Sequence, residues 1–210
     1  MSFSRRGILA ASLGLLAAPC AVAGAPAAPA PAPAPRKNWV VGQIPDTPFA
    51  IDLIDMALVP EDYHRQLVAF SGPEPAGSIV VDAAKRHLFF VLMNGKAVRF
   101  GIAVGREGAA WHGTAVVGRK AKWPGWTPTA NMRAKNPALP VHQPGGPSNP
   151  LGARALYLYK DGRDTLYRIH GTNDPSSIGK SASSGCIRMF NEHVFELFAE
   201  VAVGTRVVVR

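Results

Sequence analysis

Hydrophobic residues occur in short runs over most of the second half of the chain, separated by residues that favour turns. The runs are rich in β-branched and aromatic residues, which is typical of strands rather than of amphipathic helices. Asn94-Gly95 is the preferred sequence of a two-residue hairpin turn, and 160–164 predicts a second hairpin. Strands are expected over residues 78–82, 87–93, 97–104, 115–118, 155–159, 165–169 and 205–209.

Helical spacing is found near the carboxyl end of the chain. Val194, Leu197, Phe198 and Val201 follow a helical period, with Asn191 as the expected N-cap. A second, short helix is expected across residues 50–58, whereas the segment 123–150, rich in Pro, Gly and Asn, predicts no regular element. The pattern therefore predicts a mostly β fold with one or two short helices, not a doubly wound α/β sheet.

The amino-terminal residues read as an export signal followed by a linker. Residues 1–23 combine Arg5 and Arg6 with a short apolar run and end in Ala21-Val22-Ala23, an A-x-A cleavage pattern. The two arginines make the signal twin-arginine-like, and we expect export to the periplasm. Residues 24–35 are almost entirely Ala and Pro, which predicts an extended linker. An entry segment (36–76) and a single main domain (77–210) follow.

The charge of the chain limits its partners. The formal net charge is +9 at pH 7, which suits an anionic surface or substrate. The chain has no basic run, zinc-finger spacing or aromatic-rich binding motif, so we do not expect nucleic acid as a partner.

Cysteine usage points to a reactive thiol. The chain has two cysteines, and Cys20 lies within the predicted export signal, which leaves Cys186 in the mature protein. A lone thiol in an oxidising compartment has no intramolecular disulfide partner, and we interpret Cys186 as a nucleophile. His170, at the end of a predicted strand, is the natural base and is expected to lower the pKa of the thiol. The carbonyl of Gly171 can orient the imidazole, while the N–H groups of Gly185 and Cys186 can stabilise an oxyanion.

These residues belong to a longer pattern. His170-Gly171-Thr172-Asn173, then Ser177-Ile178-Gly179, then Ser184-Gly185-Cys186-Ile187-Arg188-Met189 resembles the signature of the L,D-transpeptidase (YkuD-type) catalytic domain. The resemblance extends from about Gly77 to Arg210. It implies a β-sandwich-like catalytic fold and a role in building the cell wall. The thiol of such an enzyme attacks the diaminopimelate–D-Ala bond of a stem tetrapeptide, and the resulting thioester is transferred to an amine.

The resemblance also implies roles for individual residues. Cys186 matches the nucleophile and His170 the base, with Gly171 orienting the imidazole and Gly185 contributing to the oxyanion hole. Many members have His where this chain has Ser184, so any role of that histidine is absent here. No cofactor and no metal are expected. The residues expected to bind substrate are Arg188, Ser184, Thr172, Asn173 and Trp123.

The implied partners are peptidoglycan stem peptides, a wall-anchored envelope protein joined through a lysine, and carbapenem-type inhibitors. Water as the acceptor would make the protein an L,D-carboxypeptidase or crosslink hydrolase. A non-catalytic wall-binding module with an incidental thiol is a further alternative. A zinc site of His170, Cys186 and another histidine is disfavoured, because the chain lacks paired metal-ligand spacing. The sequence does not select the acyl acceptor or the oligomeric state.

Overall fold

The computed structural model describes residues 38–105, 112–183 and 185–210. The predicted export signal (1–23), the linker (24–35) and Ser184 lie outside the described residues. Lys37–Arg210 forms one compact unit. No helix among the described residues is long and apolar enough to cross a membrane.

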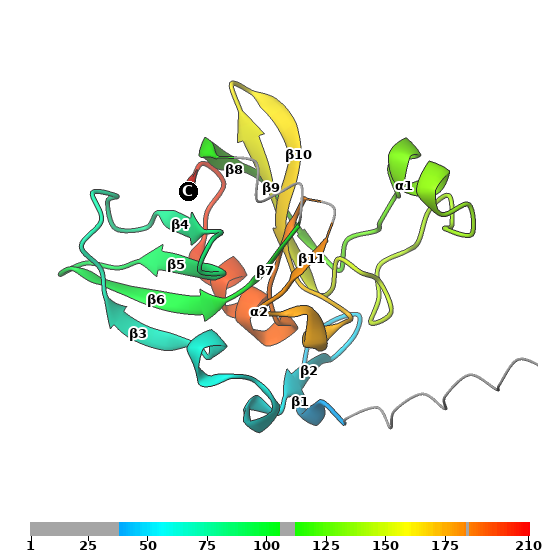
Figure 1. Cartoon of the computed structure of the whole chain (residues 1–210), viewed down its shortest axis with the longest axis horizontal. Helices are drawn as coiled ribbons and strands as arrows, with labels where there is room; N and C mark the ends of the chain where they lie inside the picture. Colours follow the sequence, from blue (N-terminus) through cyan, green and yellow to red (C-terminus); the bar gives the residue numbers. More distant parts are fainter. Residues whose placement is uncertain (1–37, 106–111, 184) are drawn as a thin grey trace, which may run out of the picture. The chain divides into compact units, whose positions relative to one another are not determined.

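The described residues of this unit form two sheets (Figure 1). A two-stranded antiparallel sheet joins β1 and β2, and an eleven-stranded sheet has the order β11-β7-β12-β10-β9-β8-β13-β4-β5-β6-β3. The strands are β1 (Val40–Ile44), β2 (Ile51–Ile54), β3 (Gln66–Ala69), β4 (Ile79–Asp82), β5 (His87–Val91), β6 (Lys96–Gly101), β7 (Ala103–Gly105), β8 (Gly113–Lys122), β9 (Arg154–Lys160), β10 (Arg163–His170), β11 (Ser181–Ser183), β12 (Ile187–Arg188) and β13 (Arg206–Val209). The helices are α1 (Ala130–Lys135) and α2 (Asn191–Glu200), with 3-10 turns η1 (Met56–Leu58), η2 (Glu61–Tyr63) and η4 (Pro175–Ser177).

Both predicted hairpins are confirmed. Asn94 and Gly95 have φ values of 60° and 65°, as a type I′ turn requires, and they join β5 to β6 with Val91 opposite Ala97. Asp161 and Gly162, with φ of 51° and 74°, make the same kind of turn between β9 and β10. The turn at Asp161 and Gly162 therefore pairs β10, which ends at His170, antiparallel to β9.

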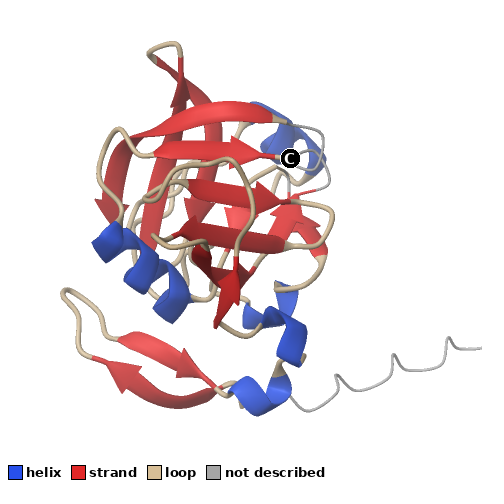
Figure 2. Cartoon of the chain, turned by 90° about the vertical axis from the view of Figure 1, so that its left-hand side faces the viewer, coloured by secondary structure: helices blue, strands red, loops and turns tan. Residues whose placement is uncertain are grey.

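The largest apolar cluster of the described residues lies between the large sheet and α2. Val194 and Leu197 of α2 are fully or almost fully buried against a cluster that includes Leu156 and Leu158 of β9. On its other side α2 packs against β2, so the helix lies between the two sheets (Figure 2). The architecture is the mostly β, sandwich-like fold that the sequence predicted.

Three local expectations were wrong. The helix expected across residues 50–58 is instead β2 followed by η1, because pairing with β1 outweighs the weak local preference for a helix. The segment 123–150 contains α1, which Thr129 caps by accepting a hydrogen bond from Met132 N at 3.2 Å. Phe190, not Asn191, occupies the N-cap of α2.

Asn191 is used for a long-range contact instead of a cap. Its Oδ1 accepts hydrogen bonds from Ala153 N at 3.0 Å and Thr172 N at 3.1 Å, and its Nδ2 donates to the carbonyl of Thr172 at 2.8 Å. This amide fixes the start of β9 and the segment just after β10 to the first turn of α2. It thereby holds the backbone beside His170.

Candidate active site

Parallel pairing of β10 with β12 brings the predicted histidine and cysteine to neighbouring strands. Ile169 lies opposite Ile187 and His170 opposite Arg188, and Met189 N donates to the carbonyl of His170 at 2.8 Å. Cys186 immediately precedes β12, so continuing the register by one residue places it beside Arg168. The side chains of His170 and Cys186 line the same cavity.

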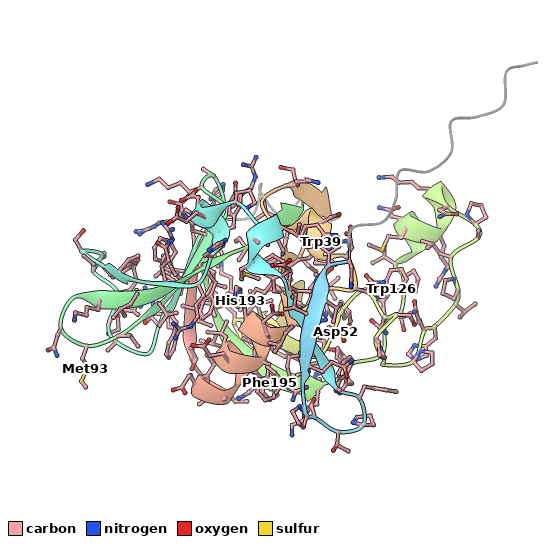
Figure 3. All side chains as sticks on the ribbon, turned by 90° about the horizontal axis from the view of Figure 1, so that it is seen from below. Trp39, Asp52, Met93, Trp126, His193 and Phe195 are labelled. Carbon is pink, nitrogen blue, oxygen red and sulfur yellow. The ribbon has the colours of Figure 1, made fainter. Side chains whose placement is uncertain are left out.

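That cavity has a volume of about 930 Å³. Strands β8, β9 and β10 form one wall, and the loop that carries α1 forms the other, with Trp126 on that loop (Figures 1 and 3). Among the residues that the structure describes, the lining includes four cations and no carboxylate, the cations being Arg119, Lys135, Arg168 and Arg188. A cavity of this charge favours an anionic ligand.

The imidazole of His170 is 3% exposed, and its Nδ1 donates to the carbonyl of Gly171 at 2.6 Å. Burial, with Arg188 and Arg168 adding to it, lowers the pKa of His170 to about 3, while the backbone of Gly171 and Leu151 acts in the opposite direction. His170 is therefore neutral at physiological pH. A neutral imidazole held by a backbone carbonyl is in the form that accepts a proton.

Cys186 is half-buried, and its Sγ donates to the carbonyl of Leu166 at 3.9 Å. Burial raises the pKa of the thiol, although the nearby guanidinium groups of Arg168 and Arg188 act in the opposite direction. This differs from the expectation that histidine lowers the pKa of the thiol. The resting pair is a neutral thiol beside a neutral imidazole, because burial disfavours both charged forms.

The backbone around the thiol is shaped by glycine and by a bulge. Gly185 is buried with φ of 137°, a conformation that a residue with a Cβ rarely adopts. On β10 the register shifts between Asp164 and Arg168, and Leu166 in that bulge has φ of 63°. The bulge turns the carbonyl of Leu166 toward both Cys186 and the guanidinium of Arg168.

The residues expected to bind substrate are divided between the cavity and its supports. Arg188 lines the cavity, and burial lowers the pKa of its half-buried guanidinium, while Asp174 and Cys186 act in the opposite direction. Thr172 and Asn173 do not line the cavity: Thr172 is buried and bonds to Asp174, and Asn173 Nδ2 donates to the carbonyl of Ser148 at 2.8 Å. Ser184 lies outside the described residues.

Trp123 also lies away from the cavity. It is 7% exposed, packs edge-on against Phe49 and donates from Nε1 to Asp46 Oδ2 at 2.9 Å. Trp126, three residues later, lines the cavity instead. The roles predicted for Thr172, Asn173 and Trp123 stay predictions, and the contacts of these residues favour a supporting role.

Sequence reasoning missed a row of side chains beside the thiol. In the register of the sheet Arg119 of β8 lies opposite Tyr157 of β9, and Tyr157 lies opposite Arg168 of β10. The Cζ atoms of Arg119 and Arg168 lie 3.4 Å and 4.7 Å from the centroid of the Tyr157 ring. These residues are far apart in sequence and fit no motif, so only the strand register reveals the row.

Comparison with known proteins agrees with this geometry. A model of the L,D-transpeptidase catalytic domain (YkuD) matches residues 76–209. The chain belongs to this family. The probable L,D-transpeptidase ErfK/SrfK of Escherichia coli is 41% identical over 138 residues, which cover 61% of this chain and 42% of that protein. The probable L,D-transpeptidase YbiS of Escherichia coli is 42% identical over 136 residues, which cover 61% and 43%.

This L,D-transpeptidase also resembles a solved structure, and the match covers nearly the whole length of that structure. A crystal structure titled as a probable carnitine operon oxidoreductase, caia, from Brucella melitensis is 43% identical, with a TM-score of 0.50, and the match covers 74% of this chain and 99% of that one. That title refers to a different activity, and the family assignment rests on the family model. The chain spans less than half the length of the two Escherichia coli relatives.

Proposed function

We propose that this L,D-transpeptidase uses Cys186 as a nucleophile on the peptide bond between diaminopimelate and D-Ala in a peptidoglycan stem tetrapeptide. The observation that carries the proposal is a shared cavity. The thiol of Cys186 and the imidazole of His170, whose Nδ1 is held by Gly171, line one cationic cavity in a chain of this family.

The neutral resting pair defines how the thiol is activated. His170 accepts the proton of Cys186 as the sulfur attacks the carbonyl carbon, so that no thiolate has to accumulate beforehand. The N–H groups of Gly185 and Cys186 receive the developing oxyanion. The imidazolium then returns its proton to the nitrogen of D-Ala, which leaves, and a thioester remains on Cys186.

The second half-reaction repeats this exchange with an acceptor. An amine of a neighbouring stem peptide gives a wall crosslink, and a lysine of a wall-anchored envelope protein gives protein attachment. Water gives a shortened tripeptide, as in an L,D-carboxypeptidase or crosslink hydrolase. The proposed place of action is the periplasm, reached through the export signal of residues 1–23. Replacing both Arg5 and Arg6 by Lys should block export if the twin-arginine route is used, and unchanged export would contradict that route.

Intact-protein mass spectrometry tests the nucleophile. The purified protein is incubated with a carbapenem and, separately, with a disaccharide tetrapeptide. We expect a covalent adduct with each compound in the wild type and none in Cys186→Ala. An adduct that persists in Cys186→Ala, or no adduct in a folded wild-type protein, would contradict the proposal and favour a wall-binding module.

The products identify the acceptor in the same experiment. A crosslinked dimer indicates transpeptidation between stems, and a tripeptide indicates hydrolysis. Thioester formation without either product indicates that the acceptor is a protein amine, which a lysine-terminated peptide added to the reaction would test directly.

A further inference from the structure

Arg168, Tyr157 and Arg119 form a row that begins beside the thiol and crosses the three neighbouring strands β10, β9 and β8. Cys186 lies beside Arg168, Arg168 lies opposite Tyr157, and Tyr157 lies opposite Arg119. Residues opposite each other across neighbouring strands point to the same face of a sheet. All four side chains line the one cavity.

The two arginines of the row differ in their partners. Arg168 is largely compensated, since its guanidinium donates to the carbonyl of Leu166 and lies 3.3 Å from Asp164 Oδ2. Arg119 is exposed and stacks with its Cζ 3.4 Å from the centroid of the Tyr157 ring. No ion pair joins Arg119 to any residue that the structure describes. Stacking on Tyr157 fixes the plane of this guanidinium and leaves the N–H groups at its edge open to donate hydrogen bonds to a carboxylate.

The distance from Arg119 to the thiol can be estimated from the spacing between neighbouring strands. Tyr157 lies two strands from Cys186, roughly 10 Å at about 4.8 Å per strand. Arg119 comes from the next strand beyond Tyr157, and its Cζ lies 3.4 Å from the centroid of the Tyr157 ring. The guanidinium is therefore roughly 10 to 13 Å from the sulfur. In diaminopimelate six C–C bonds separate the reacting carbonyl from the side-chain carboxylate, roughly 7.5 Å when extended. A hydrogen bond of about 2.9 Å to the guanidinium and a separation of roughly 3 Å between the sulfur and the carbonyl carbon bring the total to about 13 Å, which matches the distance from the sulfur to Arg119.

We infer that Arg119, held by Tyr157, binds the side-chain carboxylate of diaminopimelate in the acyl donor and selects donors in which that carboxylate is free. The inference rests on the proposed function, because it names the substrate group that the same cavity recognises. Arg119 acts in the first half-reaction, before any acceptor binds. It is a specificity residue that touches substrate at a distance from the reacting atoms.

Thioester formation with two matched donors tests the inference. One tetrapeptide carries the free side-chain carboxylate of diaminopimelate and the other carries its amide, and no acceptor is added. We expect the wild type to prefer the free acid about tenfold in kcat/KM, and Arg119→Met to reduce this preference to near unity mainly through KM. Arg119→Lys should restore part of the preference, since it keeps the charge but not the planar stack.

Lys122→Met is the matched control. Lys122 is exposed on the same strand, but its register partner is Arg154, so it faces away from the Arg119 row and does not line the cavity. We expect the wild-type preference in this variant. Loss of the same preference in Lys122→Met would show that net charge, not the position of Arg119, carries the effect.

Failure of the inference is distinguishable from failure of the proposed function. If the wild type forms a thioester but Arg119→Met keeps the preference, or slows both donors equally, the inference is wrong and the function stands. If a preference appears only after an acceptor is added, the carboxylate is recognised in the acceptor, and the inference is again wrong. If no donor acylates the wild type, the proposed function itself fails.

Discussion

The two faces of strands β8, β9 and β10 differ in how their charged side chains are compensated. On the face toward α2, Arg154 is 1% exposed, lies 2.8 Å from Asp46 Oδ2 and stacks near the rings of Phe195 and Phe198. On the cavity face Arg119 is exposed with an open edge, whereas Arg168 is largely compensated by Asp164 and the carbonyl of Leu166. Successive residues of β9, Arg154 and Ala155 onward, alternate between these two environments.

The difference separates charges that hold the fold from charges that recognise a ligand. A guanidinium that is removed from water requires a partner in the same chain, as Asp46 is for Arg154. A guanidinium at the edge of a cavity stays hydrated without such a partner, so a carboxylate of the substrate can bind to it. In Figure 3, Phe195 on α2 and Trp126 on the loop of α1 mark the two regions.

Removing the proton acceptor gives the largest expected effect on the cavity face. His170→Gln should slow carbapenem adduct formation on Cys186 by about 10³-fold, because general-base assistance is lost while the size of the side chain is kept. The adduct rate is measured by mass spectrometry, and thermal unfolding shows whether the variant is folded. A folded variant that reacts at nearly the wild-type rate would contradict the role of His170.

On the opposite face, removing one charge should affect stability rather than chemistry. Asp46→Asn leaves the buried guanidinium of Arg154 without a counter-charge and weakens the bond to Trp123, so we expect a loss of about 3 kcal/mol in the free energy of unfolding. Urea denaturation measures the loss. Asp52→Asn is the matched control: it removes a charge and weakens one exposed hydrogen bond to Gln43, for which we expect less than about 0.5 kcal/mol.

The ion pair of Asp46 and Arg154 also predicts how the loss of stability in Asp46→Asn depends on pH. The bond to Arg154, with Trp123 and the backbone of Thr47, lowers the pKa of Asp46 to about 2, against an ordinary value of 3.8. A lowered pKa means stability that is fully present above 3.8 and is lost as pH falls toward 2. The difference between wild type and Asp46→Asn should therefore shrink between pH 4 and pH 2. A difference that stays constant over this range would contradict the ion pair.

A smaller loss of stability is expected when Lys120, which bonds to carbonyl groups at the carboxyl end of α2, is replaced. Lys120 Nζ donates to the carbonyl of Phe198 at 2.6 Å and to that of Val201, and it lies 4.2 Å from the centroid of the Phe198 ring. Lys120→Met keeps the apolar stem but removes the donors from two carbonyls at the helix end, which should cost about 1 kcal/mol. Lys122→Met on the same strand is the control, and an equal loss in both variants would exclude a specific role for Lys120.

Local chemistry explains what the sequence predicted well. The Asn94-Gly95 turn and the apolar run in 87–93 specify a hairpin by themselves, and the motif around His170 and Cys186 identified two residues that line one cavity. The helix expected across 50–58 failed because the local signal there is weak and β1 supplies a partner strand. Asn191 has the side chain of a cap but bonds to residues 19 and 38 positions away.

The environment of the site was less accessible to sequence reasoning. The Arg119–Tyr157–Arg168 row depends on the register of three strands and on the bulge in β10, neither of which a linear motif encodes. The pKa values of His170 and Cys186 depend on burial, which the sequence of the motif does not report. The pairing with His170 favoured an ionised thiol, whereas burial in the folded chain disfavours the charged form of both groups.

The smallest expected effect is that of pH on acylation, and it tests the resting state of the pair. With its pKa lowered to about 3, His170 stays neutral from pH 5 to pH 8, and the raised pKa of Cys186 keeps the thiol protonated over the same range. The rate of carbapenem adduct formation should then change by less than about twofold between these limits. An imidazole with the ordinary pKa of about 6.5 would instead lose roughly tenfold in rate between pH 7.5 and pH 5.5. Such a loss would show that His170 is exposed to water when the donor binds, and the contrast between a catalytic pair kept neutral by burial and an exposed Arg119 would no longer hold.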